Sequence, residues 1–472
     1  MRARYLKPTA GTYECRSLEL HLKSDERIAQ AYRVEGFSDL GPASPDSTDP
    51  WVHRGLFDSH LHVTWLGETE RRVMAERYSD ATRYVAALNA ELQKTPTDEI
   101  LLSYGFDEDR WGLAKEDLYL TVGAALDPSR KWIVFRVCGH CACASPALLG
   151  SLGVVTDKQL LDDPEIHEIQ SRMPPTSRAT LKQDFLRAQE RLLAGGIDTV
   201  GDMSLDEGLI EAILELHHGG QIDFDYQGVM IDETAKGGYL TSPLLDEPKT
   251  ESRHFAIRHW KRYLDGSFGS RTACLRAPYA DDASTKGLRL YETAELIESA
   301  RQALKRGFAL SFHAIGDGAL EQLLEMSDAL QDEMRALNDR VGFKIHRIEH
   351  AQMMGDDQLK RLQLLGLWTL CVQPYHRDAD ASFIEKRLGK IRLQSEAYRL
   401  KSLLEAGLPV SIGSDAPITF YDPVKTLSAC DVISFEDALW RYSEGGRRSH
   451  GLPVRELAVA ARVWLLEPCA KP

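Results

Sequence analysis

The segment GLFDSHLH, at residues 55–62, is the part of the chain that decides the fold. It is a short strand-like run that begins at a glycine and ends on two histidines, His60 and His62. Side chains alternate between the two faces of a β-strand, so two histidines separated by one residue point the same way. As neutral imidazoles they can bind one metal ion. The segment therefore predicts a strand that carries a pair of metal ligands at its C-terminal end.

Further strand-like runs follow at residues 197–202, 225–230, 257–264, 308–313, 344–350, 367–373 and 409–414. They alternate with helix-like stretches, which is the pattern of a parallel α/β sheet. Eight such runs predict a (β/α)8 TIM barrel, in which the ends of all strands meet on the face that carries the active site. Because Lys261, His313, His350 and Asp415 lie in or end these runs, we expect them to meet the two histidines of the first strand.

The gap between the first two runs, residues 63–196, is far too long for one βα connection. It holds helical patterns at 82–94 and 178–194 and strand-like runs at 99–105 and 131–137. We interpret it as a large insertion after the first strand of the barrel.

The chain resembles the amidohydrolase superfamily of metal-dependent hydrolases. The resemblance is to family 3 in particular, the group of N-substituted formamide deformylase-like and cytosine-deaminase-related enzymes. The matching segments come in the family's order: GLFDSHLH (55–62), Lys261 with DGSFGSRTA (265–273), HAIGDGA (313–319), EHAQ (349–352) and GSDAP (413–417). Five matches in order are a specific signal, whereas a single His-x-His would be weak.

The resemblance implies a distorted barrel over residues 55–472, with the insertion packed over its mouth. The family usually adds a small β domain built from both ends of the chain. Here the N-terminal β segment, residues 1–54, is short, and we expect no closing strand after the last helical block. The small β domain is therefore predicted to be reduced.

The resemblance also implies a centre of one or two divalent metal ions. Its predicted ligands are His60, His62, Lys261, His313, His350 and Asp415. A free lysine is protonated and cannot ligate, so Lys261 would serve as a carboxylated lysine that bridges two ions. Asp415 and His313 are the predicted catalytic residues, and Asp415 is the proton shuttle. Imidazole and carboxylate ligands suit zinc, with iron, manganese and nickel left open.

Four further residues are predicted to contact the substrate: His140, Arg271, His376 and Trp111. His140, His376 and Trp111 match family positions near the pocket, and Arg271 lies in the loop after the Lys261 strand. The chain departs from the family at Cys138, where the pattern favours aspartate.

The expected reaction is hydrolysis of a C–N bond in an amide, formamide or cyclic amide by a metal-activated hydroxide. Ester hydrolysis and deamination need the same ligands and stay open, as does a non-catalytic homologue that only binds a ligand. The loops and the insertion set specificity, so the sequence does not identify the substrate.

The composition of the chain indicates which partners and which cellular compartment to expect. The net charge of −14 argues against nucleic acid or an anionic membrane as partner, which leaves a small-molecule substrate. We find no signal peptide and no apolar stretch of membrane-spanning length. Eight scattered cysteines fit a reducing compartment, so a cytoplasmic enzyme is expected. A homodimer is left open.

Overall fold

The computed structural model describes residues 1–466, apart from positions 11, 29, 107–110, 114–118, 137–140, 162, 232–253 and 420. The chain divides into two compact units. The larger comprises Met1–Leu66 and Leu181–Pro472, and the smaller comprises Gly67–Thr180.

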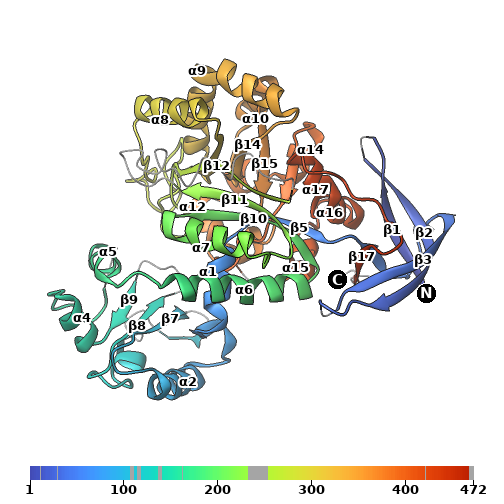
Figure 1. Cartoon of the computed structure of the whole chain (residues 1–472). Coiled ribbons are helices and arrows are strands. Elements are labelled where there is room, and N and C mark those ends of the chain that lie inside the picture. Colours follow the sequence, from blue (N-terminus) through green and yellow to red (C-terminus); the bar gives the residue numbers. More distant parts are fainter. Residues whose placement is uncertain are drawn as a thin grey trace. The chain divides into compact units, whose positions relative to one another are not determined.

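A parallel sheet of eight strands is the centre of the larger unit (Figure 1). Its strands are β5 (Leu56–Leu61), β10 (Ile197–Leu205), β11 (Asp225–Ile231), β12 (Phe255–Tyr263), β13 (Ala309–Ala314), β14 (His346–His350), β15 (Trp368–Val372) and β16 (Val410–Ile412). Each strand pairs with the next in this order. The predicted barrel strands are confirmed, and their ends differ from the prediction by a few residues at most.

The first and last strands of this sheet lie side by side, so the barrel is nearly closed. Ser59 Oγ on β5 donates a hydrogen bond to Ile412 O on β16 at 2.9 Å. Just beyond β16, the backbone N–H of Asp415 donates to His60 O at 2.7 Å. Gly413 permits this approach, because a Cβ there would lie 2.7 Å from the backbone nitrogen of His60.

Helices follow the strands along the chain. The larger unit contains α6 (Arg178–Ala194), α7 (Glu207–His218), α8 (Thr293–Lys305), α9 (Asp317–Val341), α10 (Asp356–Leu365), α11 (His376–Ala379), α12 (Ile384–Leu388), α13 (Lys390–Glu396), α14 (Leu400–Glu405), α15 (Pro423–Ser428), α16 (Phe435–Arg441) and α17 (Glu444–Ser449). Figure 1 shows α8, α9 and α10 outside the strands β12 to β15. Apolar outward side chains of the strands pack on these helices; Trp368, for example, is buried and donates to Ser327 Oγ on α9 at 3.2 Å.

Both ends of the chain form a small closed β barrel. Its strands, in spatial order, are β1 (Arg2–Pro8), β2 (Tyr13–Ser24), β3 (Tyr32–Pro42), β17 (Arg462–Leu466) and β4 (Trp51–His53). The expectation that the C-terminal part lacks a closing strand is wrong, because β17 pairs with both β3 and β4. Its five residues, RVWLL, show no alternation of polar and apolar positions, so periodicity alone could not identify them as a strand.

The smaller unit has its own sheet and core. Strands β6 (Val73–Met74), β7 (Leu101–Phe106), β8 (Trp132–Arg136) and β9 (Ala142–Ala144) form its sheet. The remaining elements there are η1 (Ala75–Arg77), α2 (Ala81–Lys94), η2 (Tyr119–Gly123), α4 (Pro146–Leu152) and α5 (Asp163–Arg172). Both α1 (Val63–Glu70) and the first residues of α6 cross the boundary between the units. That this insertion covers the barrel mouth stays a prediction. In the described part of the chain, no helix combines the length and the apolar character needed to cross a membrane.

Candidate metal centre

The predicted ligands come from five strands of the eight-stranded barrel. Their positions are His60 in β5, His62 directly after it, Lys261 in β12, His313 in β13, His350 at the end of β14 and Asp415 just after β16. Parallel strands bring their C-terminal ends to one face of a barrel. This topology gathers side chains that are more than 350 positions apart in the sequence.

The carboxylate of Asp415 lies among three imidazoles. Its Oδ1 is 3.3 Å from Nε2 of His60 and 3.3 Å from Nε2 of His62. Its Oδ2 is 3.3 Å from Nε2 of His376. Two groups of candidate ligands result, one formed by His60, His62 and Asp415 and the other by His350, His376 and Asp415. In each group the ligand atoms lie within 4.8 Å of one another.

His313 and Lys261 lie next to these groups. The ring centroid of His313 is 4.5 Å from that of His350, which in turn is 4.7 Å from that of His60. The Lys261 side chain is fully buried, and its Nζ lies 4.6 Å from the centroid of the Tyr263 ring. The site therefore holds five imidazoles, a carboxylate and an amine within a small volume.

Several buried polar atoms of the site have no hydrogen-bond partner among the described residues. They are Nε2 of His60, Nζ of Lys261, Nδ1 of His313, Nε2 of His376 and Oδ1 of Asp415. Burying such an atom without a partner costs free energy, and most buried polar groups in proteins are hydrogen-bonded. A divalent cation would satisfy the imidazole nitrogens and the carboxylate oxygen among these atoms. The residues present therefore fit a metal ion.

Contacts behind the histidines determine which ring nitrogen is free. Nδ1 of His60 lies 2.7 Å from Glu349 Oε2, and Nδ1 of His350 lies 2.8 Å from Gln373 Oε1. Both partners are acceptors, so these nitrogens carry the proton and Nε2 is left to bind a metal. His313 uses its other nitrogen, because Nε2 donates to Gly266 O at 3.1 Å and Nδ1 is free.

The pKa values of His62, His313 and Asp415 are shifted in the directions that suit metal binding. Burial lowers the pKa of His62, and burial together with the Lys261 charge lowers the pKa of His313 to about 3. Neutral imidazoles are the form that ligates. Burial acts against ionisation of Asp415, but His60 and His376 hold the pKa of its carboxyl well below the usual range.

Two residues of the centre have left-handed backbone conformations. His350 has φ 73° and Asp415 has φ 60°. Such conformations are uncommon for residues other than glycine and concentrate at functional sites. At His350 the change in backbone direction lets two consecutive side chains, those of Glu349 and His350, both reach the barrel interior, which the alternation of a regular strand would forbid.

Three buried aspartates hold the segments that carry the ligands. Asp58 accepts from the N–H of Ser414 at 2.9 Å, and Asp202 accepts from that of Val63 at 2.8 Å. Asp265 accepts three backbone N–H groups, those of Cys274, Ile315 and Gly316. Burial raises the pKa of Asp58 to about 6 and the pKa values of Asp202 and Asp265 to about 7. The sequence does not identify these aspartates as functional, because a lone aspartate carries no signal until its partner segment is known.

The predicted substrate contacts have different surroundings. His376 lies in the centre, beside Asp415. Arg271 forms an ion pair with Asp281 at 3.0 Å. Trp111 belongs to the smaller unit and packs there between Tyr84 and Phe106, with ring centroids 5.5 and 5.3 Å away.

Two further predictions concern the segment that contains Cys138 and His140, which lies outside the described residues. The substrate roles of His140, Arg271 and Trp111 stay predictions.

Two aromatic side chains near the ligands were missed. The Tyr263 ring centroid is 4.9 Å from that of His313, and the Trp65 ring centroid is 5.7 Å from that of His62. A signal for Tyr263 was available, since it lies two positions after Lys261 on the same strand and so points the same way. Trp65 follows β5 in a helical turn, where strand alternation gives no guide.

Comparison with known proteins places the chain among hydrolases. The profile of the Amidohydrolase family matches residues 52–463. The YtcJ protein of Bacillus subtilis (strain 168) is 26% identical over 403 residues, which cover 78% of this chain and 71% of that protein. An N-substituted formamide deformylase of Arthrobacter pascens is 26% identical over 141 residues, covering 30% of this chain and 25% of that enzyme. The crystal structure of an uncharacterised metal-dependent hydrolase from Pyrococcus furiosus matches with a TM-score of 0.71 and 26% identity, covering 89% of this chain and 88% of that one.

Proposed function

Since the chain belongs to the amidohydrolase family and is a metal-dependent hydrolase, we propose that it cleaves a C–N bond, other than a peptide bond, in a small amide, formamide or cyclic amide. The observation that carries this proposal is the convergence of buried, unpartnered ligand atoms around Asp415. The partial similarity to a formamide deformylase supports the choice of the C–N bond.

The ligand set supports a centre of one or two metal ions, with zinc as the metal. His60 and His62 with Asp415 would hold one ion. His350 and His313 would hold a second, and His376 is a competing ligand there because it shares a candidate group with His350. A bound divalent ion supplies Lewis-acid activation of water and of the scissile carbonyl.

Lys261 is proposed to be carboxylated when two ions are bound. Its Nζ is buried without a hydrogen-bond partner, and its positive charge would lie next to the imidazole of His313. An ammonium there repels metal ions, whereas a carbamate on the same nitrogen offers two anionic oxygens. Because Lys261 is buried beside the other ligands, the carbamate is favoured over the ammonium when metal ions are bound.

Asp415 is proposed to move the proton. Oδ1 faces His60 and His62 and is the ligand atom, whereas Oδ2 faces His376. Oδ2 would accept the proton of the attacking water and then deliver it to the leaving nitrogen, which makes the amine a better leaving group. Gln352 hydrogen-bonds Nδ1 of His376 and so fixes the imidazole that contacts Oδ2.

The cellular compartment and the class of substrate are proposed from the cysteines and the net charge. The six cysteines among the described residues are all free thiols, which supports a reducing compartment and hence the cytoplasm. The net charge of −14 supports a small-molecule substrate rather than nucleic acid or an anionic membrane.

A screen of N-formyl and N-acyl compounds with zinc-loaded protein tests this function. We expect release of the amine and the carboxylic acid, and release that is at least about 10²-fold slower by Asp415→Asn. Cleavage of esters only, or release of ammonia from an amino-substituted ring, would replace the proposed reaction by ester hydrolysis or deamination.

A further inference from the structure

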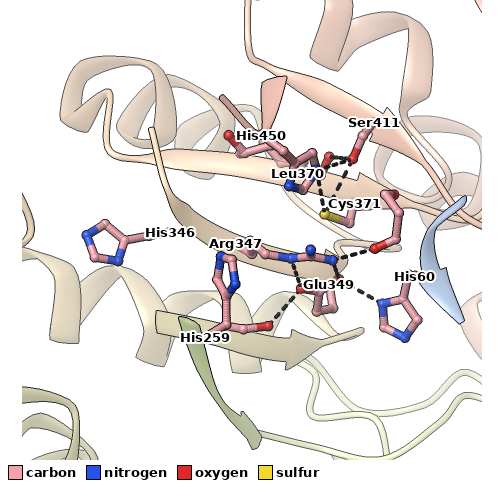
Figure 2. Close-up of polar contacts among 12 residues, drawn as sticks. His60, His259, His346, Arg347, Glu349, Leu370, Cys371, Ser411 and His450 are labelled. Carbon is pink, nitrogen blue, oxygen red and sulfur yellow. Dashed lines mark hydrogen bonds and ion pairs between the residues drawn. The ribbon is translucent and has the colours of Figure 1, made fainter. Parts of the chain in front are cut away.

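A charged pair lies behind His60 in the interior of the barrel (Figure 2). Arg347 and Glu349 are two residues apart on β14, so both side chains point inward. Both are fully buried. Because the interior of a (β/α)8 barrel is usually filled with bulky apolar residues, a buried ion pair at this position needs a reason.

The contacts of Glu349 join three strands. Its Oε2 accepts a hydrogen bond from Nδ1 of His60 at 2.7 Å. Its Oε1 accepts from Ser311 Oγ at 2.7 Å and from Arg347 Nε at 2.7 Å. The guanidinium extends the network, since Nη2 donates to Glu349 Oε2 at 3.1 Å and to Ser59 O at 2.6 Å. The carboxylate is therefore held by three side chains, one of them the imidazole of His60.

Stability alone does not account for the pair. Removing two charges from water costs free energy that their attraction often fails to recover, and apolar replacements of buried pairs are frequently neutral or stabilising. The contact with His60 provides the missing reason. The carboxylate accepts a hydrogen bond from Nδ1–H of His60. The opposite nitrogen, Nε2, therefore carries no proton and has no hydrogen-bond partner on the side of the metal centre.

We propose that Glu349 is a positioning residue for His60 and that Arg347 holds Glu349 in place for this task. The inference rests on the proposed function, because it takes His60 as a metal ligand. Carboxylates behind ligating histidines fix the tautomer and the ring orientation and raise ligand basicity; losing such a partner costs about 10–100-fold in metal affinity.

Two double variants isolate this role: Glu349→Gln/Arg347→Met and Glu349→Leu/Arg347→Met. Both remove the charges together, so neither leaves an unpaired ion in the barrel. The Gln variant keeps an oxygen that can accept a hydrogen bond from Nδ1–H of His60, and its amide group can donate a hydrogen bond to Ser311 Oγ. The Leu variant offers no acceptor, so the two proteins differ in support of His60.

The readout is metal binding by the full chain, measured as Zn²⁺ affinity in competition with a chelator and as the visible spectrum of bound Co²⁺. We expect the Leu variant to bind Zn²⁺ about 10–100-fold more weakly than the Gln variant, with a shifted Co²⁺ spectrum. Glu444→Gln is the matched control. Glu444 is a buried glutamate that accepts from Arg455 Nε at 2.9 Å and is not in contact with a histidine of the centre, so its loss should lower stability and leave Zn²⁺ affinity unchanged.

The outcomes distinguish a failure of the positioning role of Glu349 from a failure of the proposed function. Equal Zn²⁺ affinities and spectra of the Leu and Gln variants overturn the positioning role alone. A wild-type chain that binds no Zn²⁺ or Co²⁺ overturns the proposed function and this inference with it. If the Leu variant does not fold, Glu349→Asp decides, because it keeps both charges but withdraws the carboxylate from His60. Undiminished metal affinity of Glu349→Asp would then reject the proposal.

Discussion

Replacing Asp415 by asparagine should abolish most of the activity and leave the fold intact. The backbone contacts of this residue do not involve the side chain: its N–H donates to His60 O at 2.7 Å, and its C=O accepts from the N–H of Ile418 at 2.8 Å. The φ angle of Asp415 is 60°, in the left-handed region. Apart from glycine, asparagine and aspartate are the residues that tolerate this region best, so asparagine fits the position. Asp415→Asn should therefore retain the local structure, whereas Asp415→Ala should cost about 1–2 kcal/mol.

The loss of rate follows from what the amide cannot do. An asparagine accepts no proton at neutral pH and is a poor replacement for the Oδ1 atom that lies 3.3 Å from both His60 and His62. General acid–base catalysis contributes about 10²–10⁴-fold, which corresponds to about 3–5 kcal/mol of activation free energy. We expect kcat to fall at least about 10²-fold, and further if metal is lost as well.

The assay is kcat on a substrate identified by the N-acyl and N-formyl screen, with metal content and thermal unfolding of the apo-protein measured in parallel. A variant that keeps most of its rate with full metal content would refute the proton-shuttle role. A variant that unfolds would show instead that Asp415 is a structural residue, and His376 would become the next candidate for the base.

Three other results are expected. Lys261→Ala should lose the second metal of a two-metal centre and regain part of it with short carboxylic acids, as metal analysis would show; a two-metal site unaffected by the change would exclude a bridging carbamate. Removal of metal by a chelator should abolish activity, and Zn²⁺ should restore it. Burial, aided by the Arg455 charge, lowers the pKa of His53 to about 3, so the folded state stays neutral while the unfolded state gains a proton below about pH 6.5. The contribution of His53 to stability should then fall by about 2 kcal/mol between pH 6.5 and 5, measured as the difference between the wild type and His53→Gln in denaturant titrations.

The sequence predicts the barrel well because its strands are buried on both faces. Runs such as residues 308–313 are mainly apolar, with Ser311 as the exception, and end on a histidine, which locates both the strand and its functional end. β17 at Arg462–Leu466 was missed because its pattern is short and its two partners lie more than 400 positions earlier in the chain. Long-range pairing of this kind leaves no local periodicity.

The centre is predicted less completely, because type and spacing do not reveal contacts. The substrate contact of His376 stays a prediction, and its Nε2 also lies 3.3 Å from Asp415 Oδ2, which the sequence does not reveal. His346 lies on the same strand as His350, yet it accepts from Leu310 N and donates to Met334 O in the core. The supporting carboxylate Glu349 immediately precedes His350, and strand alternation would have directed it away from the centre. Only the left-handed backbone at His350 brings both inside.

Metal content is the most direct test of the central claim that the side chains around Asp415 form a divalent metal centre. The measurement is elemental analysis of the full chain purified without chelator, repeated for a His60→Ala/His62→Ala variant of unchanged secondary structure. We predict close to one or two equivalents of a divalent metal, zinc foremost, in the wild type, and a clear loss in the variant. A wild type that contains only traces of metal and gains none from added Zn²⁺, or a double variant that retains the full content, would contradict the assignment.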